Sequence, residues 1–413
     1  MKIAVVGGGS TYTPELIDGF ARLAPFASEI VLLDPAQERL DVVGAFARRL
    51  MAAHGHPGKL RWTSDVDDAL AGAATVVIQL RVGGQAARIS DETFPLACDC
   101  VGQETTGAGG LAKALRTVPV VLDIARRADP GAWIVNFTNP VGIVTRALLD
   151  HGYKAAGLCN VAIGFQRRFA ATLGTDPASV VLDHVGLNHL TWERAVYVDG
   201  VDRLPELLSS HISDISAEVQ IPSDVLASLG NVPSYYLRYF YCHDLVVAEE
   251  RGQPTRGAKV SEIETELLKM YADPTLTVKP ELLGQRGGAF YSEAAVGLIA
   301  SLQHDDGGIH AVNVRNDGTM PFLPDDAVIE VTCRVGAAGA TPLPVTPLAP
   351  HHRGLVGAVS AYEELAVEAA VHGGRDRVYQ ALLAHPLVGQ HAQATRLTDD
   401  LLAANRDHLA WLS

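Results

Sequence analysis

The sequence predicts an α/β protein in which a doubly wound parallel sheet is followed by a mixed α+β domain. Three observations support this prediction. Short apolar runs alternate with helical stretches up to about residue 190, three consecutive glycines directly follow the first run, and the alternation ends beyond residue 190. Strands that alternate with helices form parallel sheets that are covered by helices on both faces. We therefore expect two domains, over residues 1–190 and 191–413.

The first domain is expected to contain five strands. The apolar runs that predict them are residues 3–6, 30–33, 76–80, 133–137 and 155–158. Helical patterns lie between them, for example at residues 111–126 and 141–149. Pro14 and Glu15 favour the start of a helix directly after the first glycine turn.

The second domain shows a different pattern. We expect a strand at residues 192–198 and mainly helices over residues 204–271. Apolar runs at 309–314 and 327–331, separated by turn signals such as Asn316-Asp317-Gly318, predict two more strands. Residues 358–371 and 382–412 are predicted to be closing helices, and this domain is expected to bind substrate and to form the oligomer.

Composition excludes several classes of protein. The formal net charge is −14 and no basic stripe is visible, so a nucleic-acid partner is not expected. No apolar stretch approaches the roughly 18 residues that a membrane span needs, so no membrane partner is expected either. The five cysteines are odd in number and lack framework spacing, which predicts reduced thiols and a cytoplasmic protein.

The glycine run predicts a dinucleotide site. Gly7, Gly8, Gly9, Ser10 and Thr11 join the first strand to a helix, where glycine lets a pyrophosphate approach the backbone and the helix N-terminus attracts it. Asp34 ends the second strand, where a carboxylate binds ribose hydroxyls and favours NAD. Tyr12 replaces the third glycine of the usual pattern, so a glycine turn in another kind of α/β protein stays an alternative. The prediction is a Rossmann-like domain that binds NAD.

Two residues are candidate metal ligands. Cys159 ends the fifth strand and His189 follows thirty residues later. Ligands of doubly wound sheets bind beyond the carboxyl ends of the strands, and a thiolate with an imidazole can hold a divalent metal there. A cysteine and a histidine this far apart are more often structural, and that reading stays open at this point.

Other residues suggest acid–base chemistry or substrate binding. Four tyrosines lie between residues 235 and 241, where one is a candidate base and the others are candidates for an aromatic core. Glu104 lies in a polar, glycine-rich segment at residues 102–110, and Asn139 follows the fourth strand. Arg88 and Arg286 are candidate anion contacts, although isolated arginines are usually solvated surface charges.

Together these segments resemble glycoside hydrolase family 4, the NAD- and metal-dependent glycosidases, which depart from the usual two-carboxylate mechanism. The matching segments run through almost the whole chain. They are GGGSTYTPEL (7–16), GQETTGAGG (102–110), NFTNP (136–140), GLCN (157–160), GLNHL (186–190), YLRY (236–239), RGGAFYSEAA (286–295) and LPDDAV (323–328).

The resemblance implies a role for each matching residue. Cys159 and His189 are the implied metal ligands, usually for Mn²⁺. Tyr236 is the implied base at carbon 2 of the sugar, with Tyr235 as its competitor, and Glu104 is expected to raise the reactivity of that tyrosine. The implied substrate contacts are Arg88, Asn139, Asn160 and Arg286. The family also implies a homodimer or homotetramer.

The implied reaction is a hydrolysis that proceeds through oxidation. A hydride passes from carbon 3 to NAD⁺, which acidifies the proton at carbon 2 and allows the aglycone to leave by elimination. Water then adds, and the cofactor returns its hydride. The implied substrate is a small-molecule glycoside with an anionic group at carbon 6.

Departures from the family pattern refine the substrate. Asn160 stands where α-selective members carry an aspartate, which points to the 6-phospho-β-glucosidase branch. Ala162, Val82 and Gln285 are unusual for that branch, and Gln285 replaces a lysine beside the expected anion site. A sulfoquinovosidase or a uronidase with the same mechanism therefore stays an alternative. So do a simple NAD-dependent hydroxy-acid or sugar dehydrogenase and a non-catalytic NAD-binding sensor.

Overall fold

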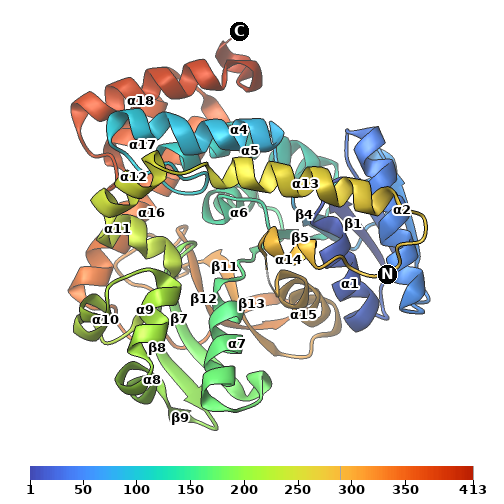
Figure 1. Cartoon of the computed structure of the whole chain (residues 1–413), viewed down its shortest axis with the longest axis horizontal. Coiled ribbons are helices and arrows are strands. Elements are labelled where there is room, and N and C mark those ends of the chain that lie inside the picture. Colours follow the sequence, from blue (N-terminus) through green and yellow to red (C-terminus); the bar gives the residue numbers. More distant parts are fainter. Residues whose placement is uncertain (289, 413) are drawn as a thin grey trace.

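The computed structural model describes residues 1–288 and 290–412, and these residues form a single mixed sheet of thirteen strands (Figure 1). Six neighbouring strands are parallel. In spatial order they are β3 (Lys59–Thr63), β2 (Glu29–Leu33), β1 (Lys2–Val6), β4 (Thr75–Ile78), β5 (Trp133–Asn136) and β6 (Ala155–Gly157). The order reverses between β1 and β4, which is where open α/β sheets bind ligands beyond their strand ends.

Helices cover both faces of the parallel strands, so the central strands are buried on both sides. Apolar, β-branched residues fill β1 and β4, and Ile3, Val5 and Val77 are fully buried. The helices of this half are α1 (Thr13–Leu23), α2 (Gln37–Ala53), α3 (Val66–Leu70), α4 (Gly84–Thr93), α5 (Gly107–Arg127), α6 (Val141–Asp150) and α7 (Val161–Leu173).

The sheet continues without a break into an antiparallel half. β6 pairs with β11 through Gly157 and Asn313. The strands of this half are β7 (Val180–Leu187), β8 (Leu190–Val198), β9 (Val201–Asp202), β10 (Val232–Pro233), β11 (Gly308–Arg315), β12 (Val328–Gly336) and β13 (Gly339–Pro342). The outer path runs from β11 through β12, β7 and β8 to β10.

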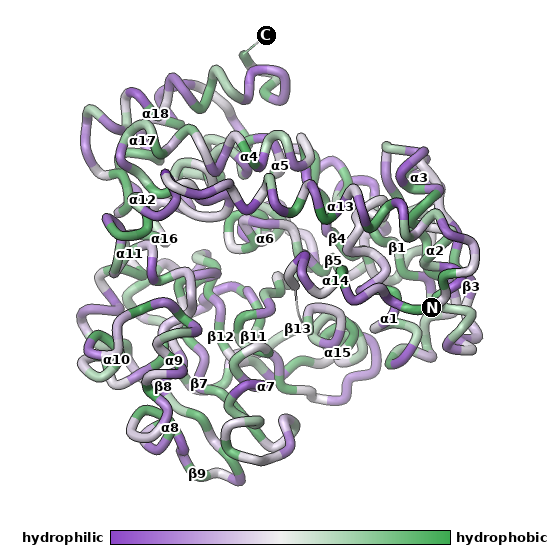
Figure 2. The backbone as a smooth tube through the Cα atoms, viewed as in Figure 1, coloured by the Kyte–Doolittle hydropathy of each residue, from purple (hydrophilic) through white to green (hydrophobic). Residues whose placement is uncertain are grey.

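The remaining helices surround this half and reach back over the parallel one. They are α8 (Leu204–Ser210), α9 (Ile212–Val219), α10 (Ser223–Leu229), α11 (Arg238–Tyr241), α12 (His243–Arg251), α13 (Arg256–Ala272), α14 (Leu282–Gln285), α15 (Tyr291–His304), α16 (Pro350–His372), α17 (Arg375–Ala384) and α18 (His391–Ala404). Helix α13 runs alongside α4. Figure 2 shows hydrophilic and hydrophobic residues alternating along α13 and α18, as expected for helices with one buried face.

The structure confirms the predicted fold class and all five strands of the first half. It adds β3, β7 and the short strands β9, β10 and β13, which were not predicted. The helix predicted over residues 382–412 was wrong, because α17 ends at Ala384 and α18 begins at His391 after a turn. The division into two domains at residue 190 stays a prediction, since the sheet runs across that point. None of the helices in the described ranges is long and apolar enough to cross a membrane.

Candidate functional site

The glycine turn forms one wall of a cleft of about 620 Å³ beyond the carboxyl ends of β1, β2 and β4. Gly7, Gly9 and Ser10 line this cleft, whereas Gly8 is buried against β2. Gly7 has φ +86°, and a Cβ atom there would lie 2.8 Å from the carbonyl oxygen of Gln79. The chain therefore needs glycine at this position both for its backbone conformation and for its close approach to the neighbouring strand.

Asp34 stands at the far end of the same cleft. Its Oδ2 accepts the backbone N–H of Gly9 at 3.0 Å, and its Oδ1 accepts that of Ala36 at 3.0 Å. The carboxylate is thus held beside the glycine turn, in the position where a dinucleotide presents its ribose hydroxyls. The residues in this cleft fit an NAD molecule.

The structure places Thr11 and Arg286 next to each other at the glycine turn. Thr11 is fully buried and does not line the cleft. Arg286 donates from Nε to the Thr11 hydroxyl at 2.8 Å and from Nη2 to Glu264 at 2.9 Å, and its Nη2 is 3.3 Å from the Ser10 hydroxyl. This arginine therefore lies against the glycine turn, on the cofactor side of the cleft.

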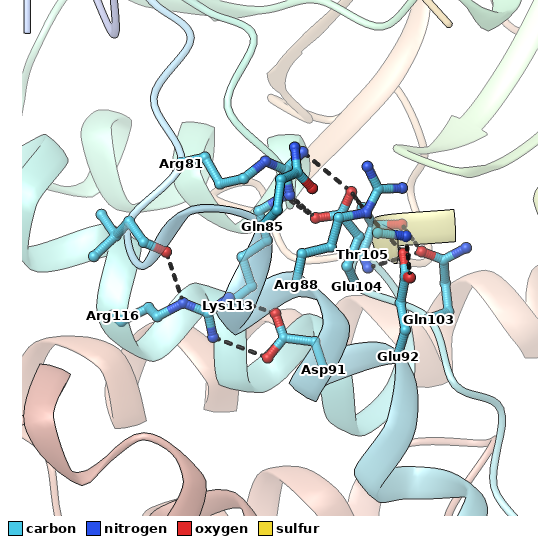
Figure 3. Close-up of polar contacts among 12 residues, drawn as sticks. Arg81, Gln85, Arg88, Asp91, Glu92, Gln103, Glu104, Thr105, Lys113 and Arg116 are labelled. Carbon is cyan, nitrogen blue, oxygen red and sulfur yellow. Dashed lines mark hydrogen bonds and ion pairs between the residues drawn. The ribbon is translucent and has the colours of Figure 1, made fainter. Parts of the chain in front are cut away.

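Glu104 is the centre of a buried charge cluster (Figure 3). Arg81, Arg88 and Lys113 all pair with it, with Arg88 Nε at 3.1 Å and Lys113 Nζ at 2.7 Å. Burial opposes ionisation, but the three cations hold the pKa of the Glu104 carboxyl well below its ordinary value. Burial also lowers the pKa of Lys113. Glu104 is consequently a fixed anion with cations on three sides.

Tyr236 lines the cleft, and the two candidate metal ligands, His189 and Cys159, act on it from behind without lining either the cleft or the compartment beside it. The Tyr236 ring stacks on the His189 ring, with centroids 3.5 Å apart and an interplanar angle of 10°. His189 Nδ1 is 3.1 Å from the Thr105 hydroxyl, which leaves Nε2 as its other ring nitrogen for a metal. Burial raises the pKa of Tyr236, and the Cys159 thiol and Glu104 raise it further.

The neighbouring Tyr235 is placed differently. Its hydroxyl accepts a hydrogen bond from Arg238 Nη1 at 2.9 Å, and its ring lies edge-on to that of Tyr236. Tyr235 does not line the cofactor cleft, whereas Tyr236 does. The geometry therefore favours Tyr236 over Tyr235 as the base.

A second compartment of about 480 Å³ adjoins the first. Arg88, Glu104, Asn139 and Tyr236 line both compartments. Oδ1 of Asn139 is buried and has no hydrogen-bond partner among the residues that the structure describes, as expected for a group that a ligand hydroxyl would satisfy. Asn160 lines the cofactor cleft at the start of α7. A sugar at the junction of the compartments would contact the tyrosine base and face the cofactor.

Two cations of the second compartment were not predicted from the sequence. Arg256 and Lys259 lie in the first turn of α13 and line this compartment, and neither has an ion pair within the described ranges. The other lining arginines, such as Arg88 and Arg238, pair with carboxylates. The sequence feature that could have located them is Thr255, a helix-capping residue directly before Arg256, because it marks the start of the helix that carries both cations.

The residues present also fit a catalytic metal site. Cys159 and His189 supply a thiol and an imidazole, both buried. Residues 1–288 and 290–412 contain no group of three or more His, Cys, Asp or Glu side chains that could enclose a metal ion. A metal held by these two side chains would keep open positions for substrate oxygens, as catalytic sites do.

Comparison with known proteins assigns the family. Residues 2–175 match the model of family 4 glycosyl hydrolases, and residues 184–388 match that of their C-terminal domain. The chain is 38% identical to a probable 6-phospho-beta-glucosidase of Bacillus subtilis, covering 99% of this chain and 97% of the relative. It is 36% identical to a 6-phospho-beta-glucosidase of Escherichia coli, covering 100% and 96%.

A solved structure agrees with these relatives. The 6-phospho-beta glucosidase of Thermotoga maritima, solved with manganese, NAD⁺ and glucose-6-phosphate, superposes with a TM-score of 0.93 at 35% identity, and the match covers 99% of both chains. The family models match most of the chain, and the relatives match it over nearly its whole length. This chain belongs to the family 4 glycosyl hydrolases.

Proposed function

We propose that this chain is an NAD- and manganese-dependent 6-phospho-β-glucosidase. One observation carries the proposal. A cleft that fits NAD meets a second compartment at Tyr236, Arg88, Asn139 and Glu104, and that compartment is also lined by Arg256 and Lys259, two cations without ion pairs in the part of the chain that the structure describes. The relatives that are 36–38% identical to this chain are named 6-phospho-beta-glucosidases, whereas a relative named as a phospho-alpha-glucosidase is 29% identical over a similar length, which supports the choice of substrate.

The chain's own residues would divide the work as follows. Bound NAD⁺ would supply a reversible hydride acceptor, and a divalent metal held by Cys159 and His189 would supply a Lewis acid at a sugar oxygen. Tyr236 would take the proton from carbon 2. Burial and Glu104 raise the pKa of Tyr236, whereas Arg88 lowers it. For Tyr236 to act as a base, cations must therefore offset the effects of burial and of Glu104. Oδ1 of Asn139 would accept a hydrogen bond from a sugar hydroxyl.

The anion at carbon 6 would be bound by Arg256 and Lys259, beside Arg88. Two cations without ion-pair partners among the described residues suit a phosphate dianion better than they suit a monoanion. Gln285 had suggested a weaker anion site, but this residue is exposed and lines neither compartment. Its carbonyl oxygen instead accepts a hydrogen bond from Arg256 at 2.7 Å. Phosphate is therefore preferred over sulfonate or carboxylate.

Two further properties belong to this proposal. The five cysteines are all free thiols, which suits the cytoplasm. A homodimer or homotetramer is proposed from the family resemblance, and light scattering on the purified chain would measure it. Neither property alters the chemistry proposed above.

The function can be tested by release of 4-nitrophenol from its 6-phospho-β-glucoside, with NAD⁺, Mn²⁺ and a thiol reductant. We expect release that requires both NAD⁺ and Mn²⁺ and that stops when a chelator removes the metal. The matched control is the 4-nitrophenyl sulfoquinovoside, which should react much more slowly. Faster release from the sulfonate would reassign the substrate. Accumulation of NADH without release of nitrophenol would indicate a dehydrogenase instead.

A further inference from the structure

Three strands of the antiparallel half bring a charged cluster into the core. His184 of β7 lies between two carboxylates, with Nδ1 2.6 Å from Glu193 Oε1 of β8 and Nε2 3.0 Å from Glu330 Oε1 of β12. The three residues are at most 1% exposed. Buried ion pairs contribute little to stability compared with apolar packing, because removing charges from water is costly. The cluster therefore calls for another explanation.

The second carboxylate oxygen of Glu330 has partners on the active-site side of the cluster. Its Oε2 accepts hydrogen bonds from Asn188 Nδ2 at 2.9 Å and from Asn313 Nδ2 at 2.7 Å. Burial opposes ionisation of Glu330, but His184 and the two amides keep its pKa below the ordinary value. Both carboxylate oxygens thus have fixed partners, and the group stays anionic.

Asn188 connects this carboxylate to the metal-binding residues. It lies in the turn between β7 and β8, directly before His189. Burial raises the pKa of the Cys159 thiol, Glu330 raises it further, and the Asn188 side chain lowers it. Asn188 therefore lies directly before one candidate ligand, beside the other, and in hydrogen-bond contact with the buried carboxylate.

We propose that Glu330 and Asn188 are positioning residues of the metal site. Glu330 fixes the amide of Asn188 at 2.9 Å, and Asn188 fixes the turn that carries His189 beside Cys159. Glu330 also adds a negative charge behind a site whose side-chain ligands are one thiolate and one neutral imidazole. Such outer groups commonly change metal affinity by about 10- to 100-fold. The inference rests on the proposed function, because it assumes that Cys159 and His189 bind a divalent metal.

The test compares three variants of the full chain. Glu330→Gln removes the charge at nearly constant shape, Asn188→Ala removes the link, and Glu193→Gln is the matched control. Glu193 is equally buried and bonds the same histidine, but it does not contact Asn188. Mn²⁺ affinity would be measured without substrate by electron paramagnetic resonance of free Mn²⁺. Co²⁺-substituted protein would report the sulfur-to-cobalt absorption band, and NAD⁺ affinity would check the fold.

We expect Glu330→Gln and Asn188→Ala to weaken Mn²⁺ binding about tenfold or more and to shift the cobalt band. Glu193→Gln should stay within about twofold of the wild-type affinity, even where it lowers the melting temperature. Equal losses of affinity in Glu193→Gln and Glu330→Gln would make the cluster merely structural and overturn the inference. Wild-type affinity in both Glu330→Gln and Asn188→Ala would also overturn it. Failure of the wild-type chain to bind Mn²⁺ would instead overturn the proposed metal site, and the inference with it.

Discussion

Tyr236 is the residue whose surroundings decide the chemistry. Its ring is held between the stacked His189 and the edge of Tyr235, so its hydroxyl has little freedom to move. Burial, Cys159 and Glu104 raise its pKa, whereas Arg88 lowers it. The free chain therefore keeps Tyr236 protonated. A loaded site adds positive charge, which is what a tyrosine needs in order to act as a base.

We predict that Tyr236→Phe abolishes exchange of the carbon 2 proton with solvent and lowers kcat by about 100-fold or more, because the base is lost. The measurement is deuterium incorporation into a 6-phosphoglucoside during turnover in heavy water. Tyr235→Phe is the matched control and should retain the exchange, since its hydroxyl bonds Arg238 instead. Loss of exchange in Tyr235→Phe alone would move the assignment by one residue.

The positions of single residues could be predicted where a local sequence motif contains them. They could be predicted less well where only the fold brings them together. Asp34 and Asn139 line the predicted cleft because strand ends gather at one edge of a parallel sheet. Arg286 was predicted to contact substrate, but it lies against Ser10 and Thr11. Ser10 and Thr11 precede Arg286 by more than 270 residues in the sequence. A local sequence pattern cannot reveal a contact between positions so far apart.

At the scale of elements, α13 connects the two compartments. Arg256 and Lys259 begin the helix at the second compartment, and Glu264 lies further along it beside the glycine turn. Glu264 accepts hydrogen bonds from Arg39, Gln85 and Arg286. Helix α4 contacts α13 at both of its own ends. Gln85 near the start of α4 donates to Glu264, and Glu92 near the end of α4 accepts the backbone N–H of Gly257 at 2.6 Å. One rigid helix thus holds both the proposed anion contacts and the partner of Arg286.

We predict that Arg256 binds the 6-phosphoglucoside, whereas Arg286 acts on NAD⁺. Arg256→Gln should raise KM for the 6-phosphoglucoside about tenfold or more, with little change in NAD⁺ affinity, because a hydrogen bond to a charged group contributes about 1.5–3 kcal/mol. Arg286→Gln should instead weaken NAD⁺ binding, measured by fluorescence titration without substrate. The opposite pattern would return Arg286 to the substrate, as the family resemblance first suggested.

Elements could be predicted where hydrophobic periodicity is strong and unbroken. The strands at β1, β2 and β5 were found within one residue at either end. β7 was missed because Asp183 and His184 interrupt its apolar pattern, and their partners Arg194 and Glu193 lie on the next strand. The final helices were wrongly joined, because the break between α17 and α18 at residues 385–390 falls in a stretch that is still rich in apolar residues.

At the scale of the whole molecule, one sheet joins the two halves. The junction of β6 and β11 pairs Gly157 with Asn313, and Asn313 also donates to Glu330. The His184 cluster therefore lies close to the place where parallel strands give way to antiparallel ones. Its two carboxylates raise the pKa of His184 to about 10, so the histidine is a cation in the folded chain.

This cation makes the stability of the chain depend on pH. The folded pKa of His184 is about 10 and the ordinary value is 6.5, so its contribution is complete below about pH 6.5 and is lost as pH rises toward 10. We predict that His184 lowers the urea midpoint of unfolding between pH 7 and about 8.5, before thiols of the unfolded chain ionise. Lys113, whose pKa is lowered by burial to about 7, acts in the opposite direction over this range, so the effect of His184 is measured as the difference between the wild-type chain and a variant. Because His184 binds or releases a single proton, it can change the free energy of unfolding by at most about 1.4 kcal/mol per pH unit.

The Glu193→Gln variant isolates this effect. Removing one carboxylate lowers the folded pKa of His184, so the variant should be less stable at pH 7 and should lose less stability than the wild-type chain between pH 7 and 8.5. Gln at residue 193 retains a side-chain oxygen that can accept the Nδ1–H bond of His184, so the comparison changes charge more than shape. Parallel pH profiles for the two proteins would mean that His184 is neutral in the folded chain, and that Glu193 or Glu330 holds the proton instead.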